Sequence, residues 1–377
     1  MNFICKTIGL RKVLLTIAIL YAPLANASGL GAPEMSASGL GVANAMTASA
    51  DDASAMAYNP AGIAWSTGTH FMVGSVLRWR NAAYQPAGAL LDIGINTGHS
   101  YLTRMQHGSK IGGGLAWTLP FAINNNWSKV GRTAVRVNRL SADLVVAVNS
   151  SLAFSLGPDW HFGQMDLTTI AGQSFQGTSH NALGGHASVM WKPWPLWSFG
   201  MLYRSSANMR FSGNNATAKL KLPDSLRIGL SRRIGANVRL ELDGKWTHWK
   251  SLNSIQVVRG NTLLQSRNLD LRNTIDIMTG LSWSWREDTR FRFGYAYEQG
   301  ASKSNSFNPA ITDLSGHRFS LGAGSNLFGV HMDVAYSYLF QPSKTARSSA
   351  SSGLAAGSSG KLKHRRQSLA ISISQYF

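Results

Sequence analysis

The chain is poor in three things: cysteine, long apolar runs and acidic side chains. Its single cysteine is Cys5, near the N-terminus, so the remaining residues can form neither a disulfide nor a cysteine-ligated metal site. The most apolar stretch, residues 13–20, contains Thr16 and is well short of the ~20 residues that a membrane-spanning helix needs. Later apolar residues are interrupted at every second position, which also argues against helical spans.

Residues 1–27 have the features of a secretory signal peptide in the right order. Lys6, Arg11 and Lys12 precede the apolar stretch, and Ala25-Asn26-Ala27 follows it as a small-residue cleavage signal. We therefore expect export and cleavage after Ala27. The alternative is an uncleaved anchor, which the short apolar stretch disfavours.

The shortage of acidic residues makes the chain strongly basic. There are 36 Lys and Arg against 17 Asp and Glu, a formal net charge of +19, and removal of residues 1–27 with their three basic residues leaves +16. Part of this charge flanks a Ser/Ala/Gly-rich segment at 342–362, where Lys361 and Lys363 lie. We interpret it as contact with outer-membrane lipid and lipopolysaccharide rather than with substrate. Nucleic acid is not an expected partner, because no basic and aromatic stripe is present.

A period of two runs through most of the remaining chain. Phe291, Phe293, Tyr295 and Tyr297 share one face of a stretch whose other face is small or charged. Such alternation is typical of a strand with one apolar face. A soluble β-sandwich also alternates, but here aromatic residues gather near strand ends, as in the girdles of membrane strands. We predict an all-β protein, a closed transmembrane antiparallel β-barrel.

Turn signals divide this part into about fourteen strands. An even number brings both ends of the barrel to the periplasmic side, where the tight turns are expected. Tight connections are predicted at 107–109, 157–159, 193–195, 286–288 and 326–329, and longer ones at 80–98, 122–133, 171–181, 250–271, 300–314 and 342–362.

The segment before the barrel does not alternate and consists mainly of small residues. It is either a flexible periplasmic tail or a plug inside the barrel. A fourteen-stranded barrel has a lumen too wide for its own side chains to fill, since such filling works near eight strands. We therefore predict a hatch at 28–66, between the signal peptide at 1–27 and a barrel at 67–377.

An ordered set of short motifs resembles the FadL family, the outer-membrane transporters for long-chain fatty acids and aromatic hydrocarbons. Each motif is weak alone, but the set covers nearly all of the mature chain. It comprises S-G-L-G at 38–41, A-D-D-A-S at 50–54, N-P-A-G at 59–62, a strand ending in Pro-Phe at 110–121, residues 127–132, Y-R-S at 203–205, L-P-D-S at 222–225, residues 243–249, and Asp313 with His317 and Arg318.

The resemblance implies passive uptake of a hydrophobic compound. Substrate would enter from outside, reach an apolar pocket closed by the hatch, and leave sideways through a gap at a kinked third strand. Asn59-Pro60-Ala61 of the hatch would brace that strand, and Gly112-Gly113-Gly114 would allow its kink. Long-chain fatty acids are the expected cargo, with toluene-like aromatic hydrocarbons as the alternative. Leu30 stands where the family often has an aromatic residue that reaches into the pocket.

Alternation also assigns several charged residues to the lumen. A buried fatty-acid carboxylate needs a cation or hydrogen-bond donors to offset its desolvation, whereas an aromatic hydrocarbon does not. Arg204 and Arg239 are the preferred candidates for substrate contact, with Lys245 third. The alternative is that these charges pair with one another or with the hatch.

No catalytic set stands out. The histidines are scattered and form no H-E-x-x-H spacing, so we expect neither an enzyme nor a metal or other cofactor. A general diffusion porin and a structural or adhesin barrel remain the alternatives to a transporter. We expect a monomer in the bacterial outer membrane, delivered by the barrel-assembly machinery, for which a terminal aromatic such as Phe377 is the usual signal.

Overall fold

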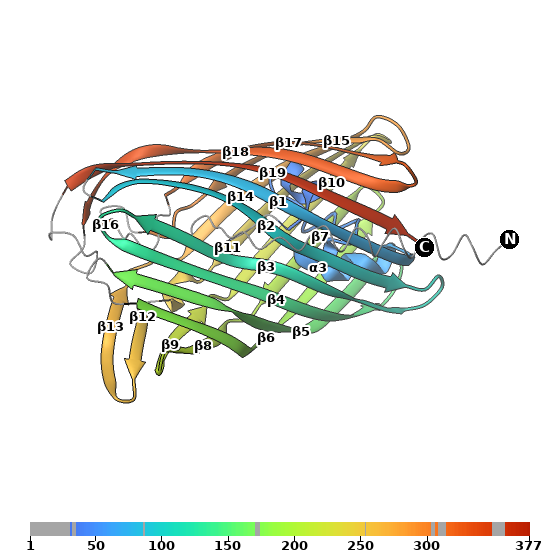
Figure 1. The fold of residues 1–377 in the computed structure, drawn as a ribbon. Coiled ribbons are helices and arrows are strands. Elements are labelled where there is room, and N and C mark those ends of the chain that lie inside the picture. The colour runs from blue at the N-terminus through green and yellow to red at the C-terminus, as the bar shows by residue number, and fades with distance from the viewer. Residues whose placement is uncertain are drawn as a thin grey trace.

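The computed structural model is a closed antiparallel β-barrel with a short helical segment inside it (Figure 1). The strand β1 (Gly68–Tyr84) pairs with β2 (Gly88–Met105) on one side and with β19 (Ser359–Tyr376) on the other, which closes the sheet. No helix among the described residues is long and apolar enough to cross a membrane. The structure describes residues 31, 35–85, 87–169, 174–252, 254–302, 306–307, 314–348 and 359–377.

The remaining strands follow in chain order around the barrel. They are β3 (Ile111–Trp127), β4 (Gly131–Ala147), β5 (Leu152–Thr169), β6 (Ser174–Trp194), β7 (Trp197–Arg204), β8 (Ala207–Gly213), β9 (Ala216–Leu222), β10 (Ser225–Ile234), β11 (Val238–Thr247), β12 (Ser254–Arg259), β13 (Thr262–Asn268), β14 (Thr274–Ser284), β15 (Arg290–Glu298), the two-residue β16 (Ser306–Phe307), β17 (Gly316–Leu327) and β18 (Val330–Ser348).

Four barrel strands are interrupted, so that each appears as two elements. The pairs are β7 with β8, β9 with β10, β11 with β12, and β13 with β14; β6, for example, pairs with both β7 and β8. A short 3₁₀ helix, η2 (Trp249–Ser251), lies in the break between β11 and β12. Counted this way, the described residues form fourteen barrel strands, which confirms the predicted fold class.

The two ends of the barrel differ. The first and last strands begin and end together at one end, where Phe377 N–H donates to Thr69 O at 2.9 Å and Thr69 N–H donates back at 3.1 Å. The same end has the tight turns, such as 195–196 and 328–329, and is therefore the periplasmic end. At the other end the predicted loops at 80–98 and 122–133 were wrong. The ladders continue there, and the links shrink to 85–87 and 128–130.

The predicted turn at 157–159 was also wrong. These residues lie inside β5, and the turn between β4 and β5 is at 148–151. Asp159 is on the inward face of β5, where its Oδ2 lies 2.8 Å from Arg204 Nη1. This ion pair depends on the position of Asp159 within the strand. Pro158 has no N–H to donate, and β4 and β5 have no paired residues between Ser141–Asp159 and Leu144–Leu156.

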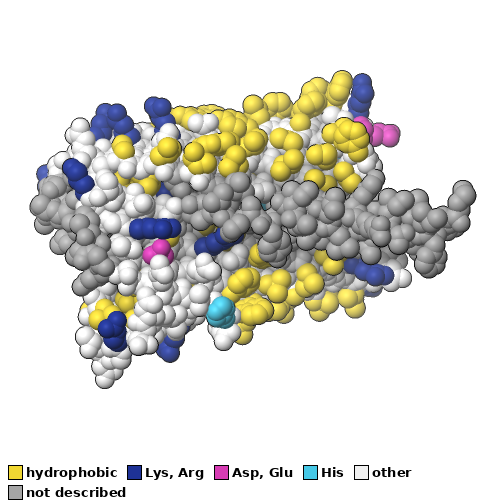
Figure 2. All heavy atoms as spheres, in the orientation of Figure 1, with side chains coloured by type: hydrophobic (Ala, Val, Ile, Leu, Met, Phe, Trp, Pro, Cys, Tyr) yellow, Lys and Arg dark blue, Asp and Glu magenta, His cyan; other side chains and the backbone are white. Residues whose placement is uncertain are grey.

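The outer surface carries an apolar band. Leu144, Leu156 and Leu183 are 56%, 68% and 72% exposed, far above what a soluble protein would leave in water at successive wall positions. Figure 2 shows such side chains over the periplasmic half and the middle of the barrel, whereas Lys and Arg gather toward the opposite end. The band is therefore the lipid-facing surface of the wall.

Candidate functional site

The N-terminal residues 35–66, called the inner segment below, lie inside the periplasmic half of the barrel (Figure 1). The segment contains α2 (Ala37–Gly41), α3 (Ala55–Tyr58) and the 3₁₀ helix η1 (Pro60–Trp65). The helix α2 packs against β15, β17, β18 and β19, whereas η1 packs against β2 to β6. The segment therefore spans the lumen from one wall to the other.

Two carboxylates of β11 hold the backbone of the inner segment. Asp243 Oδ2 accepts hydrogen bonds from the N–H groups of Met46 (3.0 Å) and Thr47 (2.9 Å). Glu241 Oε1 accepts from Ala48 N–H at 2.7 Å and, at 3.2 Å, from the next N–H along the chain. Because these N–H groups are outside any long helix, the carboxylates supply the acceptors that secondary structure does not.

A second anchor is ionic. Asp51 Oδ2 lies 2.8 Å from Nη1 of Arg239 on β11 and 3.0 Å from Nη1 of Arg290 on β15. Burial raises the pKa of Asp51, but the two guanidinium groups outweigh it and hold the net pKa below its usual value. Asp51 is therefore ionised and binds the inner segment to β11 and β15, the strands on either side of β14.

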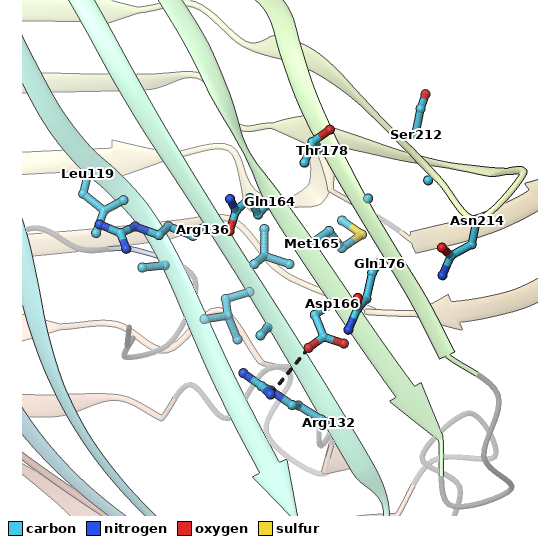
Figure 3. Close-up of a pocket in the computed structure, with 16 residues that line it drawn as sticks. Leu119, Arg132, Arg136, Gln164, Met165, Asp166, Gln176, Thr178, Ser212 and Asn214 are labelled. Carbon is cyan, nitrogen blue, oxygen red and sulfur yellow. Dashed lines mark ion pairs between the residues drawn. The ribbon is translucent and has the colours of Figure 1, made fainter. Parts of the chain in front are cut away.

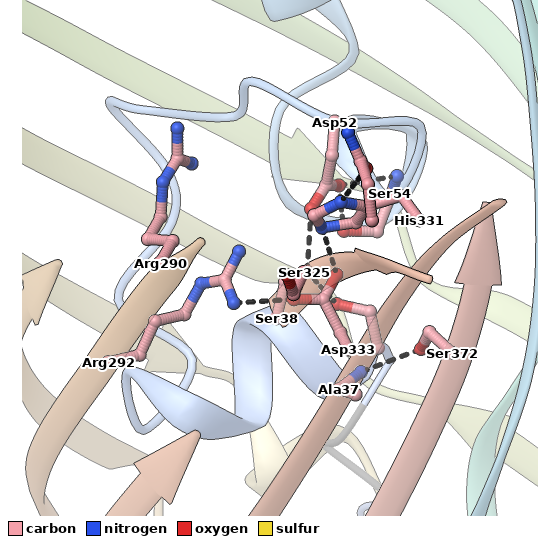
Figure 4. Close-up of polar contacts among 12 residues, drawn as sticks. Ala37, Ser38, Asp52, Ser54, Arg290, Arg292, Ser325, His331, Asp333 and Ser372 are labelled. Carbon is pink, nitrogen blue, oxygen red and sulfur yellow. Dashed lines mark hydrogen bonds and ion pairs between the residues drawn. The ribbon is translucent and has the colours of Figure 1, made fainter. Parts of the chain in front are cut away.

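Asp52 next to it has the opposite environment. Burial raises the pKa of Asp52, and the negative charge of Asp51 adds to the rise. Its carboxylate accepts from Ser38 Oγ at 2.6 Å and from Ser54 N–H at 2.8 Å, which joins α2 to α3. Figure 4 shows this cluster beside Arg292 and Asp333 of the wall, and Ala37 N–H donating to Ser372 Oγ at 2.9 Å.

Five glycines of the wall admit the backbone of the inner segment. A Cβ at Gly294 would lie 2.3 Å from Ala43 N, and one at Gly200 would lie 2.0 Å from Thr47 O. No real Cβ approaches so closely, so larger residues there would displace the segment. The five lie on one side of the barrel, from β7 to β17 with β11 between the second and the third: Gly200 on β7, Gly229 on β10, Gly280 on β14, Gly294 on β15 and Gly322 on β17.

The tripeptide Asn59-Pro60-Ala61 is buried where α3 ends and η1 begins. Asn59 Nδ2 donates to Thr47 O at 2.8 Å and to Val189 O of β6 at 3.0 Å, and Ala61 N–H donates to Ser188 Oγ at 3.0 Å. Two of these three hydrogen bonds go to β6, while η1 also packs against the predicted partner β3. A role in gating stays a prediction.

The glycines of β3 lie in a regular part of the sheet. Gly112, Gly113 and Gly114 pair with β2 on one side and with β4 on the other. A Cβ at Gly114 would lie 2.6 Å from Met56 Sδ, so this glycine makes room for α3. That the three allow a kink stays a prediction, because the irregularity itself begins farther along the strand.

That irregularity leaves a seam between β2 and β3. Their pairing ends at Trp117, and the register between β3 and β4 shifts between Thr118 and Phe121, around Pro120. Beyond this point Phe121 pairs instead with Gly31, in an isolated antiparallel bridge. The N-terminal segment thus occupies the position on β3 that β2 has left.

The predicted substrate contacts have partners in the structure. Arg204 Nη1 lies 2.8 Å from Asp159 Oδ2, and its Nη2 donates to Met56 O at 2.9 Å. Arg239 binds Asp51, as described, and Lys245 stands opposite Asp276 in the β11–β14 ladder. These positions agree with the alternative given above, in which the lumen charges pair with one another or with the inner segment. Contact of these three residues with substrate stays a prediction. Leu30 lies outside the described residues.

The extracellular half of the lumen, called the outer lumen below, has an apolar lining; the resemblance implied an apolar pocket, but the residues that line it were not predicted from the sequence. The lining includes the ring contact between Phe121 and Trp249, whose centroids lie 6.1 Å apart at 84°. Its buried side chains come from β3 to β6, β8, β9, β12 and the link between β13 and β14, among them Ile123, Val135, Val137, Met165, Leu167, Phe175, Met209, Phe211, Leu220, Leu222, Ile255 and Val257.

In the interrupted strands the lining follows from a change of phase at the break. Below the break at Ser205 and Ser206, the inward residues of β7 are Gly200, Leu202 and Arg204. Above it, Ala207, Met209 and Phe211 point inward and Asn208 points to the outside. The signal was present as an apolar alternation shifted by one residue, but every apolar face had been assigned to lipid.

Within the described ranges, no group of three His, Cys, Asp or Glu side chains is arranged to hold a metal ion. The site therefore consists of a polar plug region, an apolar outer lumen above it, and a seam in the wall beside both.

Comparisons with known proteins agree with this architecture. A protein-family model described as outer membrane protein transport protein (OMPP1/FadL/TodX) matches residues 115–377. Outer membrane protein P1 of Haemophilus influenzae is 25% identical over 182 residues, 44% of this chain and 39% of that protein. The chain thus matches about two fifths of the length of this curated relative.

Solved structures share the fold across nearly the whole chain. A FadL homologue of Pseudomonas aeruginosa has a TM-score of 0.83 at 16% identity, covering 93% of this chain and 100% of that one. The toluene transporter TodX of Pseudomonas putida has a TM-score of 0.66 at 14% identity, with the same coverage. Because the family model matches more than half of the sequence, the chain belongs to the OMPP1/FadL/TodX family of transport proteins of the bacterial outer membrane.

Proposed function

We propose that the protein is a passive channel for hydrophobic compounds, with long-chain fatty acids as its cargo. The observation that carries the proposal is the apolar outer lumen, which faces the extracellular side above a plug held by hydrogen bonds and ion pairs. Apolar burial releases about 25 cal/mol per Å² of surface, so an apolar chain gains free energy by entering from water. No energy source is required for that step.

Arg204 is the residue we propose for contact with a fatty-acid carboxylate. It is the last charged side chain of β7 before the inward apolar run of β8 begins, so it lies at the floor of the outer lumen. A carboxylate there would compete with Asp159 for the guanidinium group, and the Arg204 bond to Met56 O would couple cargo to the inner segment. Arg239 and Lys245 lie nearer the periplasmic end and are second choices.

We propose further that residues 28–66 act as the hatch, after removal of 1–27, and that the barrel comprises 67–377. Support comes from the placement of the anchors on β11, β15 and β6, which a shift of the hatch would release together. The seam between β2 and β3, occupied by the Gly31 bridge to Phe121, is the proposed route of sideways release into the membrane.

Aromatic hydrocarbons are the second candidate cargo. TodX and a related channel of Ralstonia pickettii are described as toluene transporters. The aromatic pair Phe121 and Trp249 in the outer lumen suits such a cargo, which needs no cation. Binding measurements distinguish aromatic hydrocarbons from fatty acids as the cargo.

The test is competition binding on the purified full-length protein. A fluorescent long-chain fatty acid is displaced by unlabelled fatty acids and by monoaromatics such as toluene. The proposal expects fatty acids to displace it, and expects Arg204→Ala to weaken their binding about tenfold, the loss of one charge-assisted contact. Arg104→Ala, at the periplasmic end of β2, is the matched control. Displacement by toluene alone would assign the aromatic cargo, and full affinity of Arg204→Ala would remove the carboxylate contact.

Deletion of residues 28–62 tests the hatch. Steady conductance in planar bilayers is expected to be small for the full chain and large for the deletion, because the lumen would be open. A large steady conductance of the intact protein would instead indicate a diffusion porin. Unchanged uptake of both fatty acids and toluene after the deletion would leave the segment without a transport role.

A further inference from the structure

A cavity of about 690 Å³ is lined by residues of β3 to β6 and by residues 212–214, near the extracellular end of the wall (Figure 3). We call it the rim groove. Its lining includes Arg132 and Arg136 of β4, Gln164 and Asp166 of β5, and Gln176 and Thr178 of β6.

The alternation of β4 and β5 shows which way these side chains point. The β4–β5 register is constant along both strands, so every second residue keeps the same face. Leu140 and Leu144 of the lipid-facing band are in phase with Arg136, whereas Val135 and Val137, which line the outer lumen, are out of phase with it. The polar residues of the groove therefore face the surroundings of the barrel.

The position of the groove relative to the membrane follows from the side chains on the wall below it. Leu140 lies four residues from Arg136 along β4, about 13 Å toward the membrane centre. On β5 the aromatic pair Trp160 and Phe162, with ring centroids 5.9 Å apart, comes directly before Gln164. Aromatic side chains of membrane barrels lie at the headgroup level, so the rim groove begins where the lipid headgroups of the outer leaflet are.

The groove and the wall next to it carry an excess of positive charge. Arg132 pairs with Asp166 at 3.5 Å, and this is the single acidic residue in the lining. The outward face continues over β8 and β9 with Arg210 opposite Lys219, and with Lys221 on the same face. Such a surface fits a ligand with several negative charges.

We propose that the rim groove binds the phosphorylated sugar headgroup of the outer-leaflet glycolipid, lipopolysaccharide. Guanidinium groups bind phosphate through paired hydrogen bonds, which suits Arg132 and Arg136. The amide and hydroxyl groups of Gln164, Gln176 and Thr178 can donate to and accept from sugar hydroxyls. The acyl chains would then lie along the apolar band below. The polar side chains of this site face away from the cargo route, although Val135 and Met165 of the outer lumen also belong to the lining of the groove.

Native mass spectrometry of the full-length protein in detergent tests the proposal, with bisphosphorylated lipid A and its dephosphorylated form as probes. We expect Arg132→Gln/Arg136→Gln to bind the bisphosphorylated form about tenfold more weakly, as expected for lost charge-assisted contacts. Arg104→Gln/Arg233→Gln removes the same charge at the periplasmic end and is expected to bind like wild type. Equal affinity of wild type and the groove variant, or equal weakening for both lipid forms, would overturn the proposal.

A second variant separates the groove from general surface charge. Thr178→Trp fills the groove without changing its charge and is expected to weaken lipid A binding as well. Wild-type affinity of this variant would contradict binding within the groove. Fluorescent fatty acid is expected to bind all of these variants equally. If the groove variants lost fatty-acid binding and kept lipid A binding, the groove would be an entry site for cargo instead.

Discussion

At the residue scale, the inner segment is held by contacts that depend on single atoms. Glycines give its backbone space, and the acidic side chains of β11 accept its N–H groups. The sequence motifs pointed to Asn59 and Pro60 within this segment but not to the wall glycines. Alternation shows which face of a strand a glycine is on but not what packs against it, so these contacts could be found only from the structure.

Gly294→Leu is expected to displace the inner segment, because its Cβ alone would lie 2.3 Å from Ala43 N and from Val42 C. The cost of such overpacking is typically about 1–3 kcal/mol, enough to open the lumen in part. Planar-bilayer conductance is expected to rise. Gly244→Leu on β11 is the control, since a Cβ there meets no atom within 4 Å. Equal conductance of the two variants would show that close packing at Gly294 does not hold the segment.

Asp51→Asn is expected to loosen the same segment, with a pH dependence set by the carboxyl group. The pKa of Asp51 is lowered in the folded state, so its ion pairs stabilise docking at every pH above the unfolded value of about 3.9. That stabilisation is lost only as pH falls toward the lower folded pKa. The difference in hydrogen-exchange protection of residues 43–50 between wild type and variant is therefore expected to be constant from pH 5 to 8. We expect this difference in protection to correspond to about 1 kcal/mol, as for other partly exposed ion pairs. A difference that vanished at pH 7 would contradict the assignment.

At the element scale, a wall strand can have two parts. Its outward face is apolar where it contacts lipid and polar toward the extracellular end. Alternation, turn signals and aromatic residues near strand ends together predicted the closed barrel and its strand number. It did not predict how far the strands extend beyond the membrane, because polar residues on an exposed ladder resemble a loop. The phase change at Ser205 and Ser206, which turns apolar residues inward, was missed because every apolar face had been assigned to lipid.

The position of the membrane along β4 can be tested with arginine. Leu144 is 56% exposed in the apolar band, and Asn138 is on the same outward face nearer the rim. Leu144→Arg is expected to destabilise the barrel by about 2–4 kcal/mol, the cost of a cation near the bilayer centre, and Asn138→Arg by about 1 kcal/mol or less. Urea unfolding in lipid vesicles measures both. Equal costs would contradict the placement of Leu144 near the bilayer centre and Asn138 near its edge.

At the scale of the whole molecule, a wide barrel encloses two regions of opposite character. The periplasmic half is filled by a polar-anchored segment, and the extracellular half is lined by apolar side chains. We propose that hydrophobic cargo enters the second region from outside and that the first prevents an open pore. The sequence motifs indicated the family and the existence of a plug. They implied an apolar pocket but did not indicate which residues line it, since every apolar face of a strand had been assigned to lipid.

The most direct test of transport through the outer lumen is fatty-acid uptake by cells whose only such channel is this protein. Met209→Asp puts a charge into the outer lumen, and Asn208→Asp puts the same charge on the outward face of the same strand. We predict that Met209→Asp lowers uptake at least about tenfold, because an unpaired buried carboxylate would disfavour the apolar chain, while Asn208→Asp transports like wild type. Equal uptake by both, with equal amounts of folded barrel, would contradict passage through the outer lumen.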